Sequence, residues 1–451
     1  NLKRTINVFK TFPKGGIHPP ENKLTADKPT VILPVPAQVT VPVSQHIGAP
    51  ATPVVEKGAA VRAGQLIAQA KGFVSANIHS PVSGKVSKID TVVDTTGYKQ
   101  TAIVIDVEGD EWVETVDRST TLVKEITLTR EQIIERCQQC GLVGLGGATF
   151  PTHIKLTVPA GKKCDTVIIN GVECEPYLTS DHRLMLEKGA EVLTGVAIIK
   201  KALGVESVII GIEANKPDAI SNLTELAKGF QGITVQPLMV KYPQGGEKQL
   251  IKACTGREVP SGGLPLDVGV VVQNVGTAYA VYEAVQKNKP LVERVVTVTG
   301  KSVKNPGNFQ VRIGTPVSAL IEAAGGMPDD TGKVVNGGPM MGKALAITDV
   351  PVTKGTSGII LFPAEVSKRA EVLPCIRCGK CSSACAMGLE PWLISVLGQK
   401  GMFEKAEQER ITDCMECGAC AYTCPAKRPL LDYIRLGKTT VIRMARERIT
   451  K

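Results

Sequence analysis

The sequence is poor in aromatic residues and in long apolar stretches. Phe, Tyr and Trp make up only 4% of the 451 residues, too few for a platform that stacks single-stranded nucleic acid. The longest run without an acidic or basic residue, 29–55, contains six prolines, and a membrane-spanning helix does not tolerate that many breaks. We see no signal peptide or transmembrane helix. We therefore expect a protein that sits on a membrane surface at most.

Positive charge is mild overall and concentrated at one end. The net charge is +10, and the clearest basic segment is 427–451. Such a segment is either a solvated helix face or a docking surface for an acidic partner or an anionic membrane.

Cysteines, by contrast, are clustered. Of thirteen cysteines, eight lie between Cys375 and Cys424, which indicates metal binding in a reducing compartment. They form two copies of the spacing C-x2-C-x2-C-x3-C, which is the bacterial ferredoxin run for [4Fe–4S] clusters. Three thiolates of a run bind one cube and the fourth turns away to the other cube. This logic assigns one cluster to Cys375, Cys378, Cys381 and Cys424, and the other to Cys414, Cys417, Cys420 and Cys385.

Structural zinc is the alternative for these cysteines. Zinc needs four ligands, commonly supplied as two Cys-x2-Cys pairs. It does not explain a third and a fourth cysteine at fixed spacing in both copies, or Pro425 directly after the last cysteine. The pattern therefore favours two iron–sulfur clusters, which relay single electrons. Cys137 and Cys140 form a lone pair, which we interpret as buried thiols.

The pattern along the chain predicts a multidomain α/β protein. After an N-terminal arm, short β-rich runs resemble biotinyl and lipoyl domains, but Phe73 stands where those domains carry a modified lysine and Lys71 is out of register. We expect an unmodified domain of that fold. Alternating strands and helices then predict a largely parallel sheet, followed by a β-grasp-like segment. The expected domains are the arm 1–29, the barrel-sandwich (biotinyl/lipoyl-like) domain 30–110, an FMN/NAD(H)-binding α/β domain 120–290, a β-grasp-like (SLBB) domain 291–350 and a two-[4Fe–4S] ferredoxin-like domain 366–451.

A glycine-rich loop opens the α/β segment. Four glycines lie between Gly141 and Gly147, and Lys155 follows. Backbone N–H groups of such a loop can reach a phosphate. The loop is not the dinucleotide fingerprint, because Thr149 stands where the last glycine of that motif belongs.

Four segments of this region resemble the NADH-binding subunit of respiratory complex I. They are the glycine-rich loop, the segment 170–176, the Tyr-Pro-Gln-Gly-Gly-Glu segment 242–247 and the Gln-Asn-Val-Gly-Thr segment 273–277. The arrangement of the whole chain is similar to the RnfC family, the peripheral subunit of the Rnf ion-translocating ferredoxin:NAD oxidoreductases. The Gly-Gly-Ile-His-Pro-Pro start at 15–20, the Gly-Gly-Pro-Met-Met-Gly segment at 337–342 and the two-cluster end all match.

The resemblance implies an FMN site that faces NAD(H). By motif position, the residues that bind flavin or nucleotide are Gly144, Gly146, Gly147, Lys155, Asn170, Glu173, Glu175, Gly246, Glu247 and Asn274. Three residues depart from the complex I pattern: Val143 replaces a basic residue, Val172 an acidic residue and Lys248 the second glutamate. The resemblance therefore does not assign the nucleotide contacts at these positions. His153 and His182 are expected to be structural, because hydride transfer to flavin needs no protein acid or base.

The resemblance also implies partners and a location. We expect the other subunits of a membrane Rnf complex, a ferredoxin-type electron donor acting directly or through another subunit, and no nucleic acid. The location is the cytoplasmic face of the bacterial inner membrane, as a peripheral subunit. Two alternatives stay open: a cobalamin (corrin) reductase of similar plan, and a non-enzymatic polyferredoxin wiring subunit.

Overall fold

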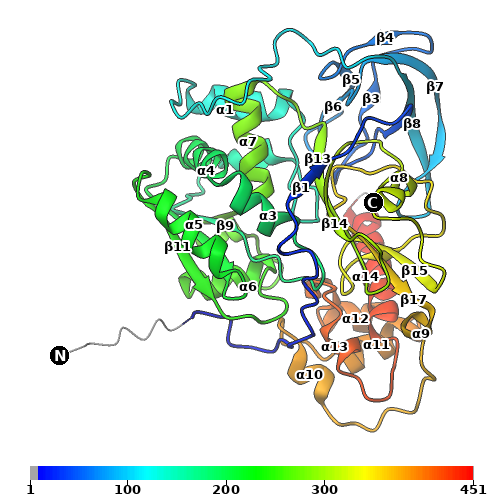
Figure 1. The fold of residues 1–451 in the computed structure, drawn as a ribbon. Coiled ribbons are helices and arrows are strands. Elements are labelled where there is room, and N and C mark those ends of the chain that lie inside the picture. The colour runs from blue at the N-terminus through cyan, green and yellow to red at the C-terminus, as the bar shows by residue number, and fades with distance from the viewer. Residues whose placement is uncertain (1–8, 450–451) are drawn as a thin grey trace.

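The computed structural model describes residues 9–449, so part of the predicted arm (1–8) and the last two residues of the basic segment lie outside it. Figure 1 shows the α/β domain beside two β-rich domains, with the cysteine module below them. Among the helices of residues 9–449, none combines the length and the apolarity needed to cross a bilayer.

The barrel-sandwich domain consists of two small antiparallel sheets. One has the order β2-β8-β7-β4 and the other β3-β5-β6. Alternate side chains point inward, among them Val39, Val41, Ile103 and Ile105, and they form the core. Phe73 lies between β5 and β6 with 79% of its surface exposed. The strands are β2 (Gln38–Pro42), β3 (Thr52–Pro53), β4 (Ala60–Val61), β5 (Leu66–Gln69), β6 (Ile78–His79), β7 (Gly84–Val93) and β8 (Lys99–Val107).

The α/β domain is built on a parallel four-stranded sheet with the order β11-β10-β9-β12. Its short apolar strands are buried on both faces, as expected where helices cover both sides. Helix α6 packs on one face, and α1, α4, α5 and α7 pack on the other. The elements are α1 (Arg130–Gln139), α2 (Thr152–Leu156), β9 (Thr166–Asn170), α3 (Ser180–Glu187), α4 (Gly189–Leu203), β10 (Ser207–Glu213), α5 (Pro217–Ala227), β11 (Ile233–Leu238), α6 (Glu247–Thr255), η1 (Pro265–Val268), β12 (Val270–Asn274) and α7 (Val275–Lys287).

The β-grasp-like domain contains a six-stranded mixed sheet with the order β1-β14-β13-β17-β15-β16. Its first strand comes from the start of the chain, and its last in sequence lies beyond residue 350. The sheet therefore extends past both predicted boundaries of this domain, 291 and 350, and its strand β1 comes from the segment that we expected to begin the barrel-sandwich domain. The elements are β1 (Thr30–Ile32), β13 (Glu293–Thr299), β14 (Gly307–Arg312), α8 (Val317–Ala323), β15 (Thr331–Asn336), β16 (Lys343–Ala344) and β17 (Gly358–Pro363).

The cysteine module is helical and has its own small core, in which five of the motif cysteines pack against apolar side chains of α11 and α14. The long helix α14 runs up behind the β-grasp-like sheet (Figure 1). The elements are α9 (Ala364–Ser367), α10 (Lys380–Ala384), α11 (Pro391–Gln399), α12 (Phe403–Gln408), η2 (Ile411–Asp413), α13 (Ala419–Tyr422) and α14 (Leu430–Ile449).

Candidate functional site

The order of the parallel strands reverses between β9 and β12. The chain adds β10 and β11 on one side of β9, and then returns to place β12 on the other side. At such a switch point the loops after the two strands separate and leave a crevice for ligands at the carboxyl ends. Asn170 ends β9 and Asn274 ends β12, and the two are paired in register. The fold thus places both predicted asparagines at the expected ligand edge.

The glycine-rich loop lies over this edge. The Gly144 N–H donates to the Phe150 carbonyl at 2.8 Å, which closes the loop. The Leu145 N–H donates to the Thr277 hydroxyl at 2.9 Å, so the loop docks on the first turn of α7. A methyl group added at Gly146 would lie 3.4 Å from Asn274 Cβ, whereas one at Gly147 would meet nothing within 4 Å. The loop is therefore tight on its inner side and open at Gly147.

Lys155 and Glu247 form an ion pair at the same edge. Lys155 Nζ lies 2.7 Å from Glu247 Oε1 and donates to the Val272 carbonyl at 3.1 Å. Gly246 precedes α6, and Glu247 is the first residue of that helix, where its negative charge is favourable. Both side chains are about one third exposed, so their charges are available to a ligand.

The two asparagines are held by hydrogen bonds that sequence reasoning did not anticipate. Asn274 donates to Asp181 at 2.7 Å and accepts from the Gly276 N–H at 2.8 Å, while Asn170 donates to the Gly245 carbonyl at 2.9 Å. Burial and the neighbouring Glu173 raise the pKa of Asp181 to about 7. No sequence motif marked Asp181, because its role depends on where α3 lies.

Glu173 and Glu175 make protein contacts. Glu173 accepts the backbone N–H groups of Asp181 at 2.8 Å and His182 at 3.2 Å, and so caps the start of α3. Glu175 accepts the N–H groups of Met340 at 3.0 Å and Met341 at 2.9 Å. Their predicted role as flavin ligands stays a prediction. In the structure they join their own loop, 172–178, to helix α3 and to the segment that contains Met340 and Met341.

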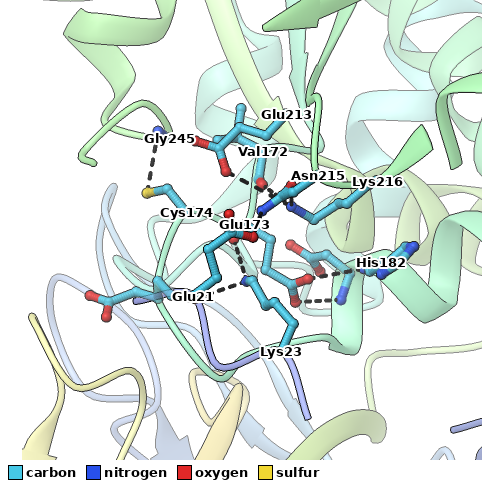
Figure 2. A network of polar contacts seen from close by, with 12 residues as sticks. Glu21, Lys23, Val172, Glu173, Cys174, His182, Glu213, Asn215, Lys216 and Gly245 are labelled. Atoms are coloured by element: carbon cyan, nitrogen blue, oxygen red, sulfur yellow. Dashed lines mark hydrogen bonds and ion pairs between the residues drawn. The ribbon is translucent and has the colours of Figure 1, made fainter. Parts of the chain in front are cut away.

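Figure 2 shows two lysines behind the loop 172–178. Lys23, from the N-terminal arm, donates to the carbonyls of Glu173, Glu175 and Leu178 at 2.7–2.9 Å. Burial, with the nearby Lys216, lowers the pKa of Lys23 to about 8. The second lysine, Lys216, donates to the Val172 carbonyl at 2.7 Å. These lysines satisfy carbonyls that the irregular loop leaves without partners.

A buried carboxylate, Glu213, lies beside Lys216. Glu213 ends β10 and lies 3.9 Å from the Lys216 ammonium, with both side chains 2% exposed. Burial raises the pKa of Glu213 to about 7, although Lys216 acts in the opposite direction. Sequence reasoning missed all three residues.

Two other expectations concern side chains near this site. His182 lies against Asp218 at 2.8 Å, and within residues 9–449 the His153 side chain makes no hydrogen bond to the loop glycines. Cys137 and Cys140 are buried, and burial raises the pKa of Cys140 to about 12. The expectation that this pair consists of buried thiols is confirmed.

The cysteine module brings together one of the two predicted ligand sets. Four cysteines line one apolar cavity together with Leu389, Ile394 and Ile434. Burial, with the neighbouring thiols, raises the pKa of Cys417 to about 11 and that of Cys420 to about 12. Cysteine must lose its proton to bind iron, so metal binding here releases protons. The four are Cys385, Cys414, Cys417 and Cys420, which is the crossed set expected from the motif spacing.

The other predicted set is open to solvent. Cys375 and Cys378 are exposed, and Cys381 and Cys424 are partly buried. Within residues 9–449, no group of three or more His, Cys, Asp or Glu side chains has the spacing of completed metal coordination. The assignment of individual ligands therefore stays a prediction. The thiol set and the apolar lining of the cavity suit an iron–sulfur cube.

The cavity lies directly against the α/β domain. Tyr242 donates its hydroxyl to the Cys417 carbonyl at 2.9 Å and lies 3.3 Å from Glu175. Gln249, from α6, donates to the Ala386 carbonyl at 3.3 Å. The N-terminal arm adds a bond from the Gly16 N–H to the Ala384 carbonyl at 3.0 Å. The α/β domain and the N-terminal arm thus contact the segments that form the four-cysteine cavity.

Comparison with known proteins assigns the family. Four family models match in order: the RnfC barrel sandwich hybrid domain over 10–110, the Nuo51 FMN-binding domain over 137–283, the SLBB domain over 295–344 and the 4Fe-4S dicluster domain over 368–425. A subunit of the proton-translocating ferredoxin:NAD(+) oxidoreductase complex of Clostridium ljungdahlii is 49% identical, over 96% of this chain and 94% of the relative. The chain belongs to the RnfC family.

Other relatives agree with this placement. The corresponding subunit of the Na(+)-translocating ferredoxin:NAD(+) oxidoreductase complex of Acetobacterium woodii is 45% identical, over 98% of this chain and all of the relative. That of an ion-translocating oxidoreductase complex of Rhodobacter capsulatus is 42% identical, over 94% of this chain and 82% of the relative. A chain of an NAD+-reducing [NiFe]-hydrogenase shares the fold, with a TM-score of 0.50 and 18% identity over 71% of this chain and 65% of that one.

These matches confirm the predicted fold class and cofactors. The RnfC chain carries an FMN-binding domain and a 4Fe-4S dicluster domain, which settles the choice between iron–sulfur clusters and zinc. The residues at the crevice suit the flavin: an open glycine loop and Lys155 for a phosphate, and amide side chains at the strand ends for a polar ring and ribityl chain.

Proposed function

We propose that this chain is the electron-transfer subunit of a membrane-associated ion-translocating ferredoxin:NAD oxidoreductase, in which it passes electrons between NAD(H), FMN and two [4Fe–4S] clusters. The observation that carries the proposal is the contact between the FMN-binding domain and the four-cysteine cavity, where Tyr242 donates to the Cys417 carbonyl at 2.9 Å. The domain of the two-electron cofactor and the cavity proposed for a one-electron centre are thereby joined by a hydrogen bond.

Bound FMN supplies the conversion between two-electron exchange with nicotinamide and one-electron exchange with a cluster. The chain's own residues bind and orient. The N–H groups at Gly146 and Gly147, with the Lys155 ammonium, would hold phosphate. The Gly144 N–H is bonded to the Phe150 carbonyl and keeps the loop closed instead. Asn170, Gly246, Glu247 and Asn274 border the crevice where the ring and ribityl chain would lie. Lys23 and Lys216 keep the loop 172–178 in place from behind.

The names of the relatives support assembly of this chain with other subunits. Relatives in Clostridium ljungdahlii and Acetobacterium woodii are named as subunits of ferredoxin:NAD(+) oxidoreductase complexes, so we infer that this chain also assembles with further subunits. We place it on the cytoplasmic face of the inner membrane as a peripheral subunit, with a ferredoxin-type donor acting directly or through another subunit.

Cofactor analysis of the reconstituted protein tests this function. We expect about eight irons per chain for two cubes, with one FMN whose absorbance is bleached by NADH. Zinc without flavin would refute the proposal. Loss of flavin with both clusters intact would favour the wiring subunit, and NADH-dependent reduction of cobalamin would favour the corrin reductase.

A further inference from the structure

A buried arginine from another domain lies behind the glycine-rich loop. Arg294, in strand β13 of the β-grasp-like domain, is 7% exposed and donates to the Leu145 carbonyl at 2.9 Å. Its guanidinium also donates to the Lys354 carbonyl. Within residues 9–449, no carboxylate forms an ion pair with Arg294. Buried charges are ordinarily paired, so the position of this cation calls for a reason.

The bond to Leu145 fixes the direction of one peptide unit of the loop. The peptide between Leu145 and Gly146 is trans, and in a planar trans peptide the C=O and the N–H point in opposite directions. Because the buried Arg294 holds the carbonyl, the Gly146 N–H points away from the protein interior. Gly146 is exposed, lies beside Asn274, and donates its N–H to no group of residues 9–449. This N–H is therefore available to a ligand at the strand-end edge.

The preceding peptide unit is held as well. The Leu145 N–H donates to the Thr277 hydroxyl at 2.9 Å, and the Leu145 side chain is buried. Both main-chain polar groups of Leu145 thus have a partner, one from the α/β domain and one from the β-grasp-like domain. The loop keeps its conformation before a ligand arrives, which lowers the ordering cost of binding.

The β-grasp-like side of the molecule also holds the start of the loop. Lys354 is 1% exposed, and its ammonium donates to the Gly141 carbonyl at 2.7 Å and to the Asn77 carbonyl at 2.8 Å. Since Arg294 donates to the Lys354 carbonyl, the two cations form one connected support. It reaches the glycine-rich loop at Gly141 and again at Leu145.

We propose that Arg294 is a positioning residue of the flavin phosphate site, through which the β-grasp-like domain sets the affinity of the α/β domain for FMN. The inference rests on the proposed function, which places the phosphate at Gly146 and Gly147. Arg294 acts through the Leu145–Gly146 peptide, whose N–H it directs toward the ligand.

The charge of Arg294 acts in the same direction. Burial lowers the pKa of Arg294 to about 10, although Asp181 opposes the shift, so the guanidinium is positively charged at neutral pH. A phosphate bound to the Gly146 N–H would lie one peptide unit away from it. The phosphate would supply negative charge to a buried cation that has no ion-pair partner within the described chain 9–449.

The plainer role for Arg294 is to satisfy two buried carbonyls. In that role its removal would loosen the contact between the domains and disturb the whole crevice, so every part of the flavin would bind less well. The proposed role concerns the phosphate alone. Riboflavin, which is FMN without the phosphate, separates the two roles.

Flavin titration tests the proposal. The full chain with both clusters, freed of flavin, is titrated with FMN and with riboflavin, and quenching of flavin fluorescence gives the two dissociation constants. In Arg294→Met we expect the constant for FMN to rise about tenfold or more and that for riboflavin to stay within about twofold of wild type. Arg294→Lys keeps the charge but not the planar fork, and should raise the FMN constant about threefold.

Arg312→Met is the matched control. Arg312 lies in the neighbouring strand β14, and its side chain is 11% exposed. It donates to the Pro81 carbonyl at 2.7 Å and pairs with Asp110 and Glu293, so it joins the same sheet to the barrel-sandwich domain instead of the loop. We expect the ratio of its two dissociation constants to equal that of wild type.

Three results would overturn the proposal. An unchanged FMN constant in Arg294→Met would do so, and so would equal weakening of FMN and riboflavin, which would leave Arg294 a structural residue. If Arg294→Met does not fold, Arg294→Lys decides alone, and a wild-type ratio of the two constants would then overturn the proposal. Failure of the proposed function is distinguishable, because the wild-type chain would then bind neither flavin.

Discussion

Replacing Lys216 by methionine should destabilise the loop that borders the flavin crevice, and increasingly so at alkaline pH. The ammonium is buried, donates to the Val172 carbonyl at 2.7 Å and lies 3.9 Å from Glu213. Methionine fills similar space but removes the charge and the donor. The substitution destabilises the folded protein in two ways. The Val172 carbonyl loses its hydrogen-bond donor, and the Glu213 carboxylate loses the positive charge beside it.

The carbonyl cost is independent of pH. An unsatisfied buried acceptor costs about 1–3 kcal/mol. The carboxylate cost depends on pH because burial holds the pKa of Glu213 at about 7, above its ordinary value of 4.5. The folded protein therefore binds this proton more tightly than the unfolded chain, and stability falls as pH rises from 4.5 through 7.

Removing Lys216 takes away the largest influence that lowers the pKa of Glu213. The pH window of falling stability then extends above 7, with an additional slope of about 1.4 kcal/mol per pH unit. Together with the carbonyl cost, the variant should lose about 2 kcal/mol at pH 7 and up to about 5 kcal/mol at pH 9.

Urea-dependent hydrogen exchange of peptides covering 166–216 measures the stability of this domain separately from the others. Lys228→Met removes an exposed lysine paired with Glu225 and should change stability by less than about 0.5 kcal/mol at every pH. In Glu213→Gln/Lys216→Met the pH dependence should disappear. A cost for Lys216→Met that is constant between pH 6 and pH 9 would refute the reasoning.

Four further substitutions have definite expected outcomes. Cys385→Ser and Cys424→Ser should each lower the iron content to about half or less, because each residue closes the cube of the other motif; full iron retention in both would disprove the crossed assignment. Tyr242→Phe removes the bond to the Cys417 carbonyl, so rapid-mixing spectroscopy should show slower cluster reduction by NADH at unchanged FMN and iron, and equal rates would show that the contact is dispensable. Burial lowers the pKa of His79 to about 3, so the protein should lose stability as pH falls below about 6.5, and this acid slope should be reduced in His79→Gln.

Local sequence pattern was sufficient to predict the alternation of strands and helices in the α/β domain and three of its elements. The apolar runs 167–170 and 207–211, which form β9 and most of β10, and the helical spacing of 190–203, which forms α4, are short-range signals. Strand β1 could not be found in this way. Thr30–Ile32 pairs with Asn308–Gln310, and nothing within three residues specifies a partner so far along the chain.

The residues of the candidate site also fall into two groups, those that a local motif marks and those that only the fold reveals. The glycine loop, Lys155, Glu247 and the strand-end asparagines were marked by motif and do meet at one edge. Lys23 and Lys216 were not, because lysine is usually exposed and its burial here follows from carbonyls that an irregular loop turns inward. Motifs identify groups that meet a ligand, whereas the groups behind the loop become visible only with the fold.

The two cysteine motifs have the same spacing but different surroundings, and that difference assigns them different roles. At the second motif, Lys438 donates to the Cys414 carbonyl at 2.6 Å and pairs with Glu416, and the Glu416 N–H donates to Cys414 Sγ at 3.4 Å. At the first motif, the corresponding Arg377 is exposed and has no ion-pair partner in the described chain. Hydrogen bonds to sulfur and exposure to solvent both tune cluster potential. Two identical ligand patterns thus lie in different surroundings, one against the α/β domain and one exposed to solvent, which is the asymmetry that the proposed relay would use.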